Sequence, residues 1–429
     1  MANVASSTAA EPGPYSILVH NPAYRWFYAG QGASLIGTWS QAAAARWIVY
    51  EMTKSERTVG IVDAIEVLPG VVIGVFAGAV ADKVSSRMLL SATQVGQSVL
   101  AFVLAFLVGT GHIQIWQMAL LLAFAQVFVT FEEPGRQVFQ RQLVGRSSLS
   151  HAIALETGLF NVSRVFGPAV AGLCLSLLGQ ASPFAINGVS FLAALAILIL
   201  IRLPSKPEDE PVEEKEDEVG LAAGFSFVWQ DRRILRIFML LAFFGMAGLG
   251  YTALVPAYAQ KLLKSSTRGY SALQVGGGVG STLGAFLVAW VAANKRRDLL
   301  VVGGMVVAGL SLVLAGLAPG VLGAKLGLYA AVALMFINGA GTIAVFATAQ
   351  TLIQAAVPDA IRGRVVGLWM IVFSASAPIG SLFSGIFAQA LGVVPIMVAS
   401  GLLCVVVGAM VFLSGTLIPS KREEREGAV

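Results

Sequence analysis

Long apolar segments, separated by short polar turns, run through almost the whole chain and leave only one long polar stretch. A helix that crosses a lipid bilayer needs about 20 predominantly apolar residues. Of the 429 residues, 57% are apolar and only 12% are charged, whereas an average soluble domain has about a quarter of its residues charged. The chain is therefore predicted to be an all-α membrane protein, with little sequence left over for a soluble catalytic domain.

Twelve membrane-spanning helices are predicted from these segments, in two groups of six. The first six lie near residues 24–50, 58–81, 88–109, 114–138, 151–178 and 182–202, and the second six near 233–259, 271–292, 299–318, 327–356, 365–390 and 394–415. In the polar stretch between the groups, eight of the eleven residues from Glu208 to Glu218 are acidic, and such a run repels itself and forms no core. The expected parts are an N-terminal tail (1–23), a six-helix bundle (24–202), an acidic cytoplasmic linker (203–232), a second six-helix bundle (233–415) and a C-terminal tail (416–429).

Basic residues are distributed unevenly about the predicted membrane. Of the 28 Lys and Arg residues, 20 fall on one side, 6 on the other and 2 within helices. Because basic residues are retained on the cytoplasmic side, both termini are expected in the cytoplasm, in a multi-pass protein of the inner (cytoplasmic) membrane. The formal charge of +5 lies mostly at helix ends and not on one soluble face, so a nucleic-acid partner is not expected.

The sequence offers no sign of an enzyme. Cys174 and Cys404 lie in separate apolar segments, and no histidine cluster has metal-ligand spacing, so we expect no metal, no cofactor and no catalytic residue. Residues 276–284 are rich in glycine but lack the Gly-Lys-Ser/Thr ending of a nucleotide loop and follow no strand. Energy for any transport is therefore expected from an ion gradient, or from the gradient of the substrate itself.

The two halves resemble each other at an offset of about 210 residues. Gly167-Pro168 in the fifth predicted helix corresponds to Ala377-Pro378 in the eleventh. Two six-helix halves that face each other across a site at the middle of the membrane are a transporter architecture. The pattern thus favours a transporter, with a small-molecule substrate and the lipid bilayer as its partners, and we expect a monomer.

Three segments carry distinctive motifs: 78–87, with a glycine, an aspartate four residues later and a basic cluster; 164–172, with a Gly-Pro pair; and 358–365, just before the eleventh helix. The first resembles the signature loop of the major facilitator superfamily, the second resembles the Gly-Pro motif associated with its antiporters, and the third strengthens the match. They are most similar to the branch that contains enterobactin exporters and drug-efflux carriers. The resemblance implies alternating access and conformational gating by these motif residues: Gly78, Asp82, Arg87, Gly167, Pro168, Asp359, Arg362 and Arg364. A simpler role for the two arginines of the third motif is to fix topology.

The chain also departs from the family pattern. The second-half counterpart of the signature loop, residues 292–297, keeps its basic cluster but has no aspartate. The fourth helix lacks the arginine at mid-helix that many proton antiporters of the family carry, and Gln126 lies in that region. The motifs alone therefore leave proton coupling open.

Seven ionisable residues lie well inside the predicted helices, away from their ends, and all are in the first half: Arg46, Asp63, Glu66, Glu132, Glu133, Glu156 and Arg164. Each costs roughly 3 kcal/mol if left charged in lipid, so they must be paired, protonated or in contact with water. Arg46 and Asp63 are nearly equidistant from the turn at Lys54 and can pair, as a structural ion pair or as an outer gate or proton site. Glu66 has no basic counterpart, and the neutral form of such a carboxylate is favoured. Glu66 is thus the leading candidate for a proton carrier, against the simpler role of solvating a cavity.

A second cluster is expected where the fourth and fifth helices meet. Glu132 and Glu133 precede Pro134, and Arg164 lies on the neighbouring helix. We expect one of the two glutamates to face Arg164 as part of a cytoplasmic gate, unless both are interfacial. Aromatic and amide side chains within the helices are candidates to line a substrate cavity or, alternatively, to pack and anchor helices: Gln31, Trp39, Asn161, Asn187, Tyr251, Asn338, Gln350 and Trp369.

The function expected from these features is proton-coupled export of an amphipathic small molecule, such as a siderophore, drug or antibiotic. An uptake carrier or facilitator is the main alternative, because nothing in the sequence fixes direction. A lipid transporter and a non-transporting membrane sensor or scaffold are further alternatives.

Overall fold

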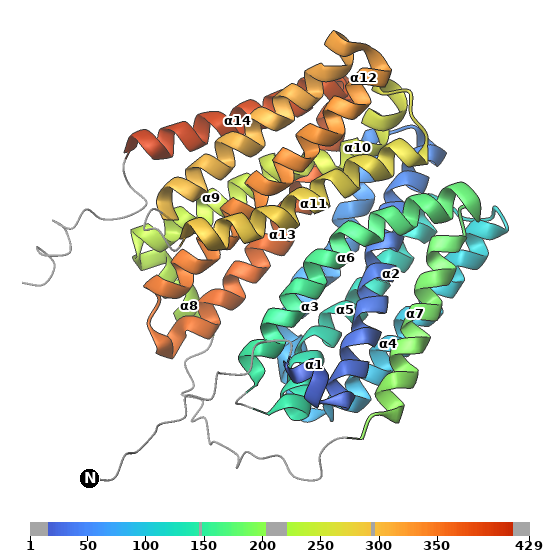
Figure 1. The fold of residues 1–429 in the computed structure, drawn as a ribbon, viewed down its shortest axis with the longest axis vertical. Coiled ribbons are helices and arrows are strands. Elements are labelled where there is room, and N and C mark those ends of the chain that lie inside the picture. Colours follow the sequence, from blue (N-terminus) through green and yellow to red (C-terminus); the bar gives the residue numbers. More distant parts are fainter. Residues whose placement is uncertain (1–15, 146–147, 203–220, 293–296, 415–429) are drawn as a thin grey trace, which may run out of the picture.

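A computed structural model describes residues 16–145, 148–202, 221–292 and 297–414. Every regular element in these residues is a helix, and helices of 18 or more residues make up two bundles that lie side by side (Figure 1). The elements of the first bundle are α1 (Ser16–His20), α2 (Pro22–Thr53), α3 (Glu56–Lys83), α4 (Ser86–Gly109), α5 (Ile115–Val144), α6 (Leu149–Leu177) and α7 (Ser182–Leu200). Those of the second are α8 (Leu221–Gln230), α9 (Arg232–Leu249), η1 (Gly250–Leu254), α10 (Val255–Ala257), η2 (Tyr258–Leu262), α11 (Thr267–Ala292), α12 (Arg297–Ala356), α13 (Asp359–Leu391) and α14 (Val393–Ser414).

Nine segments of the described chain are long and apolar enough to cross a membrane. One of them, 299–356, holds two helices, because Gly323 interrupts α12 with φ 75° and ψ 172°. The more polar helices α2 and α3, of 32 and 28 residues, run beside the others in the first bundle (Figure 1). The architecture is therefore compatible with the twelve predicted spans in two groups of six.

Three elements differ from the predicted pattern. The five-residue helix α1 falls within the predicted tail, and α8 falls within the predicted linker and packs on α9 and α13. The seventh predicted span is not one regular helix: after α9, it continues through a 3₁₀ turn at 250–254 and a π turn at 258–262. Local deviations of this kind are common at functional sites.

Both termini of the described chain lie at one end of the bundles (Figure 1). The end of α7 and the start of α8, which flank the linker, lie at the same end. We call this the termini end and the other the joined end. A single apolar core contains residues of both bundles at the joined end, among them Ile48, Val62, Leu254 and Met397. At the termini end each bundle has a core of its own, one around Phe139 and one confined to the second bundle.

Glycine allows the two bundles to touch closely at the joined end. A Cβ placed on Gly60 of α3 would lie 2.4 Å from the carbonyl oxygen of Ser381 on α13, and one on Gly385 would lie 2.5 Å from the carbonyl oxygen of Glu56. Toward the termini end, a Cβ on Gly78 of α3 or Gly367 of α13 would meet open space. Among the described residues, α3 and α13 thus approach closely at Gly60 and Gly385 but have no such contact at Gly78 or Gly367.

Candidate functional site

Arg46 and Asp63 join α2 to α3 near the joined end. The Arg46 Nε lies 3.0 and 3.1 Å from the two carboxylate oxygens of Asp63, and the side chains are 25% and 5% exposed. Tyr270, in the first turn of α11 of the second bundle, packs beside this pair. The centre of its ring lies 5.2 Å from that of Trp47, and its hydroxyl lies 3.0 Å from the Ala43 carbonyl oxygen. The pair therefore lies where the two bundles meet.

Glu66 lies one turn beyond Asp63 on α3. Its carboxylate is within electrostatic range of both Arg46 and Asp63, but within the described part of the chain no hydrogen bond or ion pair holds it. Pro69 follows within the helix and, lacking an N–H, leaves the Ile65 carbonyl without its helical hydrogen bond. Glu66 thus has a nearby cation but no fixed partner, beside a weakened part of α3.

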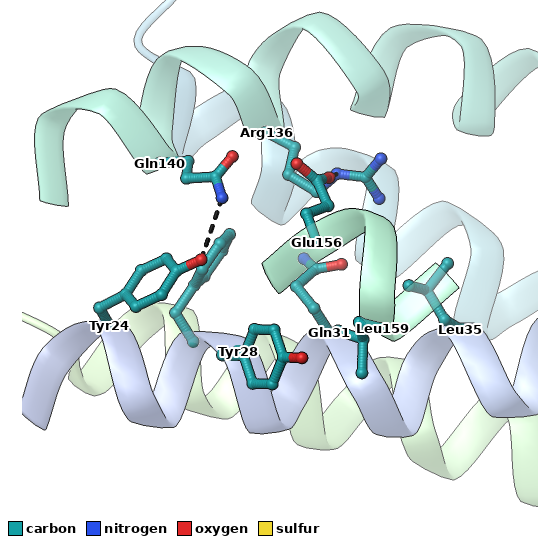
Figure 2. Close-up of a pocket in the computed structure, with 9 residues that line it drawn as sticks. Tyr24, Tyr28, Gln31, Leu35, Arg136, Gln140, Glu156 and Leu159 are labelled. Carbon is teal, nitrogen blue, oxygen red and sulfur yellow. Dashed lines mark hydrogen bonds and ion pairs between the residues drawn. The ribbon is translucent and has the colours of Figure 1, made fainter. Parts of the chain in front are cut away.

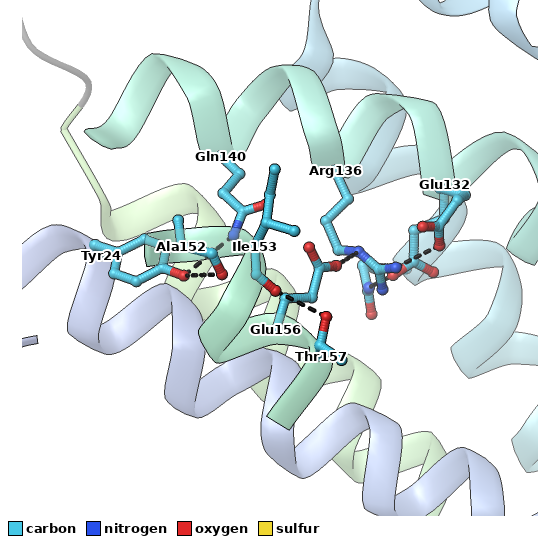
Figure 3. A network of polar contacts seen from close by, with 10 residues as sticks. Tyr24, Glu132, Arg136, Gln140, Ala152, Ile153, Glu156 and Thr157 are labelled. Carbon is cyan, nitrogen blue, oxygen red and sulfur yellow. Dashed lines mark hydrogen bonds and ion pairs between the residues drawn. The ribbon is translucent and has the colours of Figure 1, made fainter. Parts of the chain in front are cut away.

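A second polar group lies at the termini end of the first bundle (Figure 3). Arg136 of α5 pairs with Glu156 of α6, at 2.8 Å between Nε and Oε1, and also with Glu133 of its own helix. The neighbouring Glu132 is buried and accepts hydrogen bonds from two glutamines of α4, Gln94 at 3.2 Å and Gln97 at 2.5 Å. Arg136 is the cation of this group.

The expectation that Arg164 pairs with Glu132 or Glu133 is wrong. Arg164 lies eight residues after Glu156 on α6, which places it about 80° around the helix and about 12 Å further along. It faces α2, where its guanidinium carbon lies 5.7 Å from the centre of the Trp39 ring. Arg136, four residues after Glu132, takes the position that the sequence reasoning gave to Arg164.

A small pocket adjoins this polar group, between α2, α5 and α6 (Figure 2). Its walls include Tyr24, Tyr28, Gln31, Arg136 and Glu156. Tyr24 donates to the Ala152 carbonyl oxygen at 3.3 Å and accepts from Gln140 at 3.1 Å. The Gln31 side chain points toward Glu156 in Figure 2, and its amide oxygen is buried with no hydrogen-bond partner among the described residues.

Between the bundles, near mid-helix, four of the predicted residues come together. Arg164 stacks on Trp39, and the Tyr251 hydroxyl of η1 lies within electrostatic range of the guanidinium. That hydroxyl donates to Asn338 Oδ1 at 2.9 Å, and Asn338 Nδ2 donates to the Ala308 carbonyl oxygen at 3.0 Å. Trp39 and Arg164 belong to the first bundle and Tyr251 and Asn338 to the second, so this group is divided between the two.

The remaining cavity candidates lie elsewhere. Asn187 is fully buried and donates to Gln41 of α2 at 2.9 Å, so it holds α7 against α2 and does not line a cavity. Asn161 donates to the Thr157 carbonyl of its own helix at 2.8 Å. Trp369 is buried in the second bundle and stacks on Phe373, whereas Gln350 is half-buried on α12.

The motif residues have local contacts. Arg87 donates to the Ile201 carbonyl oxygen at the end of α7, and Arg362 donates to the Val357 carbonyl at 3.2 Å. A Cβ on Gly167 would lie 2.3 Å from the Trp39 Cβ, so this glycine permits the close approach of α6 and α2. Pro168 is buried beside it, and Arg364 packs against Gly224 of α8. The side chains of Asp82 and Asp359 lie outside the described residues.

A further set of contacts at the joined end was missed by the sequence reasoning. Glu56, only 1% exposed, pairs with Lys261 of η2 at 2.8 Å. Lys54 donates to Gln260 at 3.0 Å, and both lysines lie 5.9 Å from the centre of the Tyr50 ring. These contacts cross from one bundle to the other. The sequence offers no direct signal for them, because the paired residues are about 200 positions apart and each is predicted to be an ordinary polar residue near a helix end.

Known proteins resemble this chain along most of its length. A model of the transmembrane secretion effector family matches residues 13–426. The multidrug efflux pump Tap of Mycolicibacterium fortuitum is 26% identical over 398 residues, which are 90% of this chain and 92% of that protein. Macrolide efflux protein A of Streptococcus pyogenes is 21% identical over 379 residues, or 88% and 92% of the two chains.

The fold has counterparts among solved structures. A bacterial homologue of the human lysosomal transporter Spinster, crystallised in an inward-facing and unoccupied conformation, superposes with a TM-score of 0.71. The match covers 96% of this chain and 100% of that one, at 16% sequence identity. At this identity the likeness concerns the fold alone.

Proposed function

The chain belongs to the transmembrane secretion effector family of the major facilitator superfamily, and on this premise we propose that it exports an amphipathic small molecule by alternating access, in exchange for protons. It is a multi-pass membrane transporter and not an enzyme. Its efflux relatives are named for macrolides and for multiple drugs, and drug-like amphipathic molecules are accordingly the substrates that we propose. Both termini are assigned to the cytoplasm, because 20 of 28 basic residues fall on that side.

The observation that carries alternating access is the unequal contact between the bundles. They share one apolar core at the joined end and have separate cores at the termini end. With the termini in the cytoplasm, this arrangement is the inward-open state, which loads an exporter from the cytoplasm. The opposite state requires the contacts of Gly60 and Gly385 with the other bundle to separate while the termini ends approach.

Glu66 is the proposed proton carrier. Its carboxylate lies within electrostatic range of Arg46 and Asp63 and has no fixed hydrogen-bond donor in the described chain. An acid in that position gains a proton when its site opens to the acidic exterior and loses it when the site opens to the cytoplasm. Asp63, which Arg46 holds through two oxygens, serves instead to keep the cation in place.

The test is uptake into inside-out membrane vesicles with an acidic lumen. A radiolabelled macrolide, a cationic dye and an anionic dye serve as probes. Wild-type protein is expected to concentrate at least one of them when the pH gradient is imposed and to lose that uptake with an uncoupler. Glu66→Gln is expected to reduce gradient-driven uptake at least tenfold while still exchanging labelled for unlabelled substrate.

A matched variant separates this role from general damage. Glu51→Gln changes an acid at the end of α2 that accepts a hydrogen bond from Gln180, and it is expected to retain wild-type uptake. Undiminished uptake by Glu66→Gln would refute the assignment of the proton carrier. Exchange that ignores both pH gradient and uncoupler in the wild type would refute coupling and favour a facilitator.

A further inference from the structure

Arg164 is a part-buried cation near the middle of α6, and it differs from Arg46 and Arg136, the two part-buried arginines of the first bundle that form ion pairs. Arg46 lies 3.0 Å from a carboxylate oxygen of Asp63, and Arg136 lies 2.8 Å from one of Glu156. Among the described residues, Arg164 has no carboxylate within electrostatic range; its neighbours are the Trp39 ring and the Tyr251 hydroxyl. Arg164 therefore lacks the counter-charge that the other two have.

The backbone on either side of Arg164 is held firmly. Gly167 brings α6 against Trp39 of α2, where a Cβ would lie 2.3 Å from the Trp39 Cβ. Gly278 brings α11 of the second bundle against the same segment, where a Cβ would lie 3.1 Å from the Arg164 carbonyl oxygen. With both neighbours so close, α6 cannot rotate to expose this side chain to lipid or to carry it to an acid. The guanidinium is fixed at the boundary between the bundles.

An unpaired arginine at this depth is costly. A charged arginine at the centre of a membrane helix is strongly disfavoured on insertion scales. The contact with the tryptophan ring offsets only part of that cost, and the Tyr251 hydroxyl, which donates its proton to Asn338, can offer only a lone pair. The five N–H groups of the guanidinium remain largely available to an anion.

We propose that Arg164 binds an acidic group on the transported molecule, namely a carboxylate, sulfonate or phenolate attached to an aromatic or otherwise apolar body. This deepens the proposed function and rests on it. Trp39 and Phe160, whose rings pack edge to face at 5.6 Å, supply an apolar surface beside the guanidinium. Tyr251 and Asn338 approach from the second bundle, so an anion held here contacts both halves and its binding can bias their relative position.

Two dyes with the same three-ring skeleton and opposite charge test this proposal. Purified protein in phosphatidylcholine nanodiscs is titrated into carboxyfluorescein, an anion, or rhodamine 6G, a cation, and binding is read as fluorescence anisotropy against empty nanodiscs. We expect wild-type protein to bind carboxyfluorescein at least tenfold more tightly than rhodamine 6G. Arg164→Gln is expected to lose at least tenfold in affinity for carboxyfluorescein and to change rhodamine 6G binding less than twofold.

Two further variants keep the result interpretable. Arg164→Lys retains the charge but not the planar group, and it should fall between wild type and Arg164→Gln even if the glutamine variant folds poorly. Arg268→Gln removes an exposed arginine near the start of α11 and should leave both affinities unchanged. Equal binding of the dyes, no binding of carboxyfluorescein, or an unchanged preference in Arg164→Gln and Arg164→Lys overturns the proposal.

The outcome is independent of proton coupling. Anisotropy needs no gradient, so a failure of pH-driven uptake together with a preserved preference for the anion would refute the coupling and leave the anion site standing. Conversely, pH-driven uptake of a probe by wild-type and Arg164→Gln protein alike, with no anion preference, would keep the exporter and remove the site.

Discussion

The helices of the two bundles are held together by different kinds of contact. Polar and charged side chains join helices within the first bundle, as the pairs Arg46–Asp63 and Arg136–Glu156 show. In the second bundle, backbones touch directly: a Cβ on Gly280 would lie 1.8 Å from the Phe336 carbonyl oxygen. Between residues 232 and 415, the sequence has acids only at Asp298 and Asp359, both close to helix starts.

This difference indicates a division of labour. Helices packed through glycine and backbone contacts form a close, rigid unit, whereas buried ionisable groups in a membrane mark sites of ion or substrate traffic. We therefore expect the second bundle to act mainly as a fixed surface and the first to carry the groups that change protonation or bind cargo. Each of the following changes tests one side of that comparison.

The largest effect is expected from breaking the Arg46–Asp63 pair. Asp63→Asn leaves the guanidinium in the membrane without its carboxylate, and removal of one partner of a buried pair costs about 3 kcal/mol. Chemical unfolding in mild detergent measures the change in the free energy of unfolding. Because a pair replaced by apolar residues is often neutral, the double variant Arg46→Met/Asp63→Leu should recover at least half of the loss while abolishing transport.

Recovery of both stability and transport in that double variant would contradict the comparison. It would mean that the charges of the first bundle serve packing alone, as the glycines of the second bundle do.

The next effect concerns the second bundle. Gly280→Ala places a methyl group against the Phe336 carbonyl oxygen, and overpacking of this kind costs about 2 kcal/mol. The better helix propensity of alanine returns at most about 1 kcal/mol, so a net loss of stability is expected in the same unfolding assay. Gly320→Ala, at a position where a Cβ meets open space, is the matched control and should be neutral or slightly stabilising.

The pH dependence of transport in Gly280→Ala should equal that of the wild type at a temperature where both are folded. A shifted pH profile would show that the second bundle takes part in coupling directly.

Much of the fold could be predicted from the sequence, because apolar run length decides whether a helix can span a bilayer. The irregular turns η1 and η2 could not, since they lie inside a longer segment, 232–262, that is apolar enough to be predicted as one continuous span. The short helix α8 could not be predicted for a different reason. It packs on α9 and α13, and such a tertiary contact has no signature in hydropathy.

In the candidate site, an ion pair could be predicted from the sequence only where a turn fixed the depth of both partners in the membrane. Arg46 and Asp63 flank one tight turn, so their pairing followed from counting residues. Which cation pairs with Glu156 depends on how α5 and α6 are rotated about their own axes. The lengths of the two helices do not determine that rotation. Arg136 could have been found from its spacing of three and four residues after Glu133 and Glu132, which places all three on one side of a helix.

The smallest effect is expected at the Glu56–Lys261 pair, where the two bundles meet. Glu56 is buried but Lys261 is half-exposed, so solvent screening limits the pair to roughly 1 kcal/mol. Glu56→Gln should therefore raise the population that is open at the joined end by about fivefold. Spin labels at Met52→Cys and Lys264→Cys, in a background without the native cysteines, report this population by their distance distribution.

The charge-exchanged double variant Glu56→Lys/Lys261→Glu should restore the wild-type distribution. Lys54→Gln, which removes an exposed hydrogen bond to Gln260 and a contact with the Tyr50 ring but no ion pair, should change it less than twofold. If Glu56→Gln leaves the distribution unchanged, the shared apolar core alone holds the joined end closed. In that case charge acts only inside the first bundle, and the contrast between the bundles becomes sharper. If the population shifts, the second bundle contributes a charge to the conformational change through Lys261, and its role as a neutral surface is confined to the membrane interior.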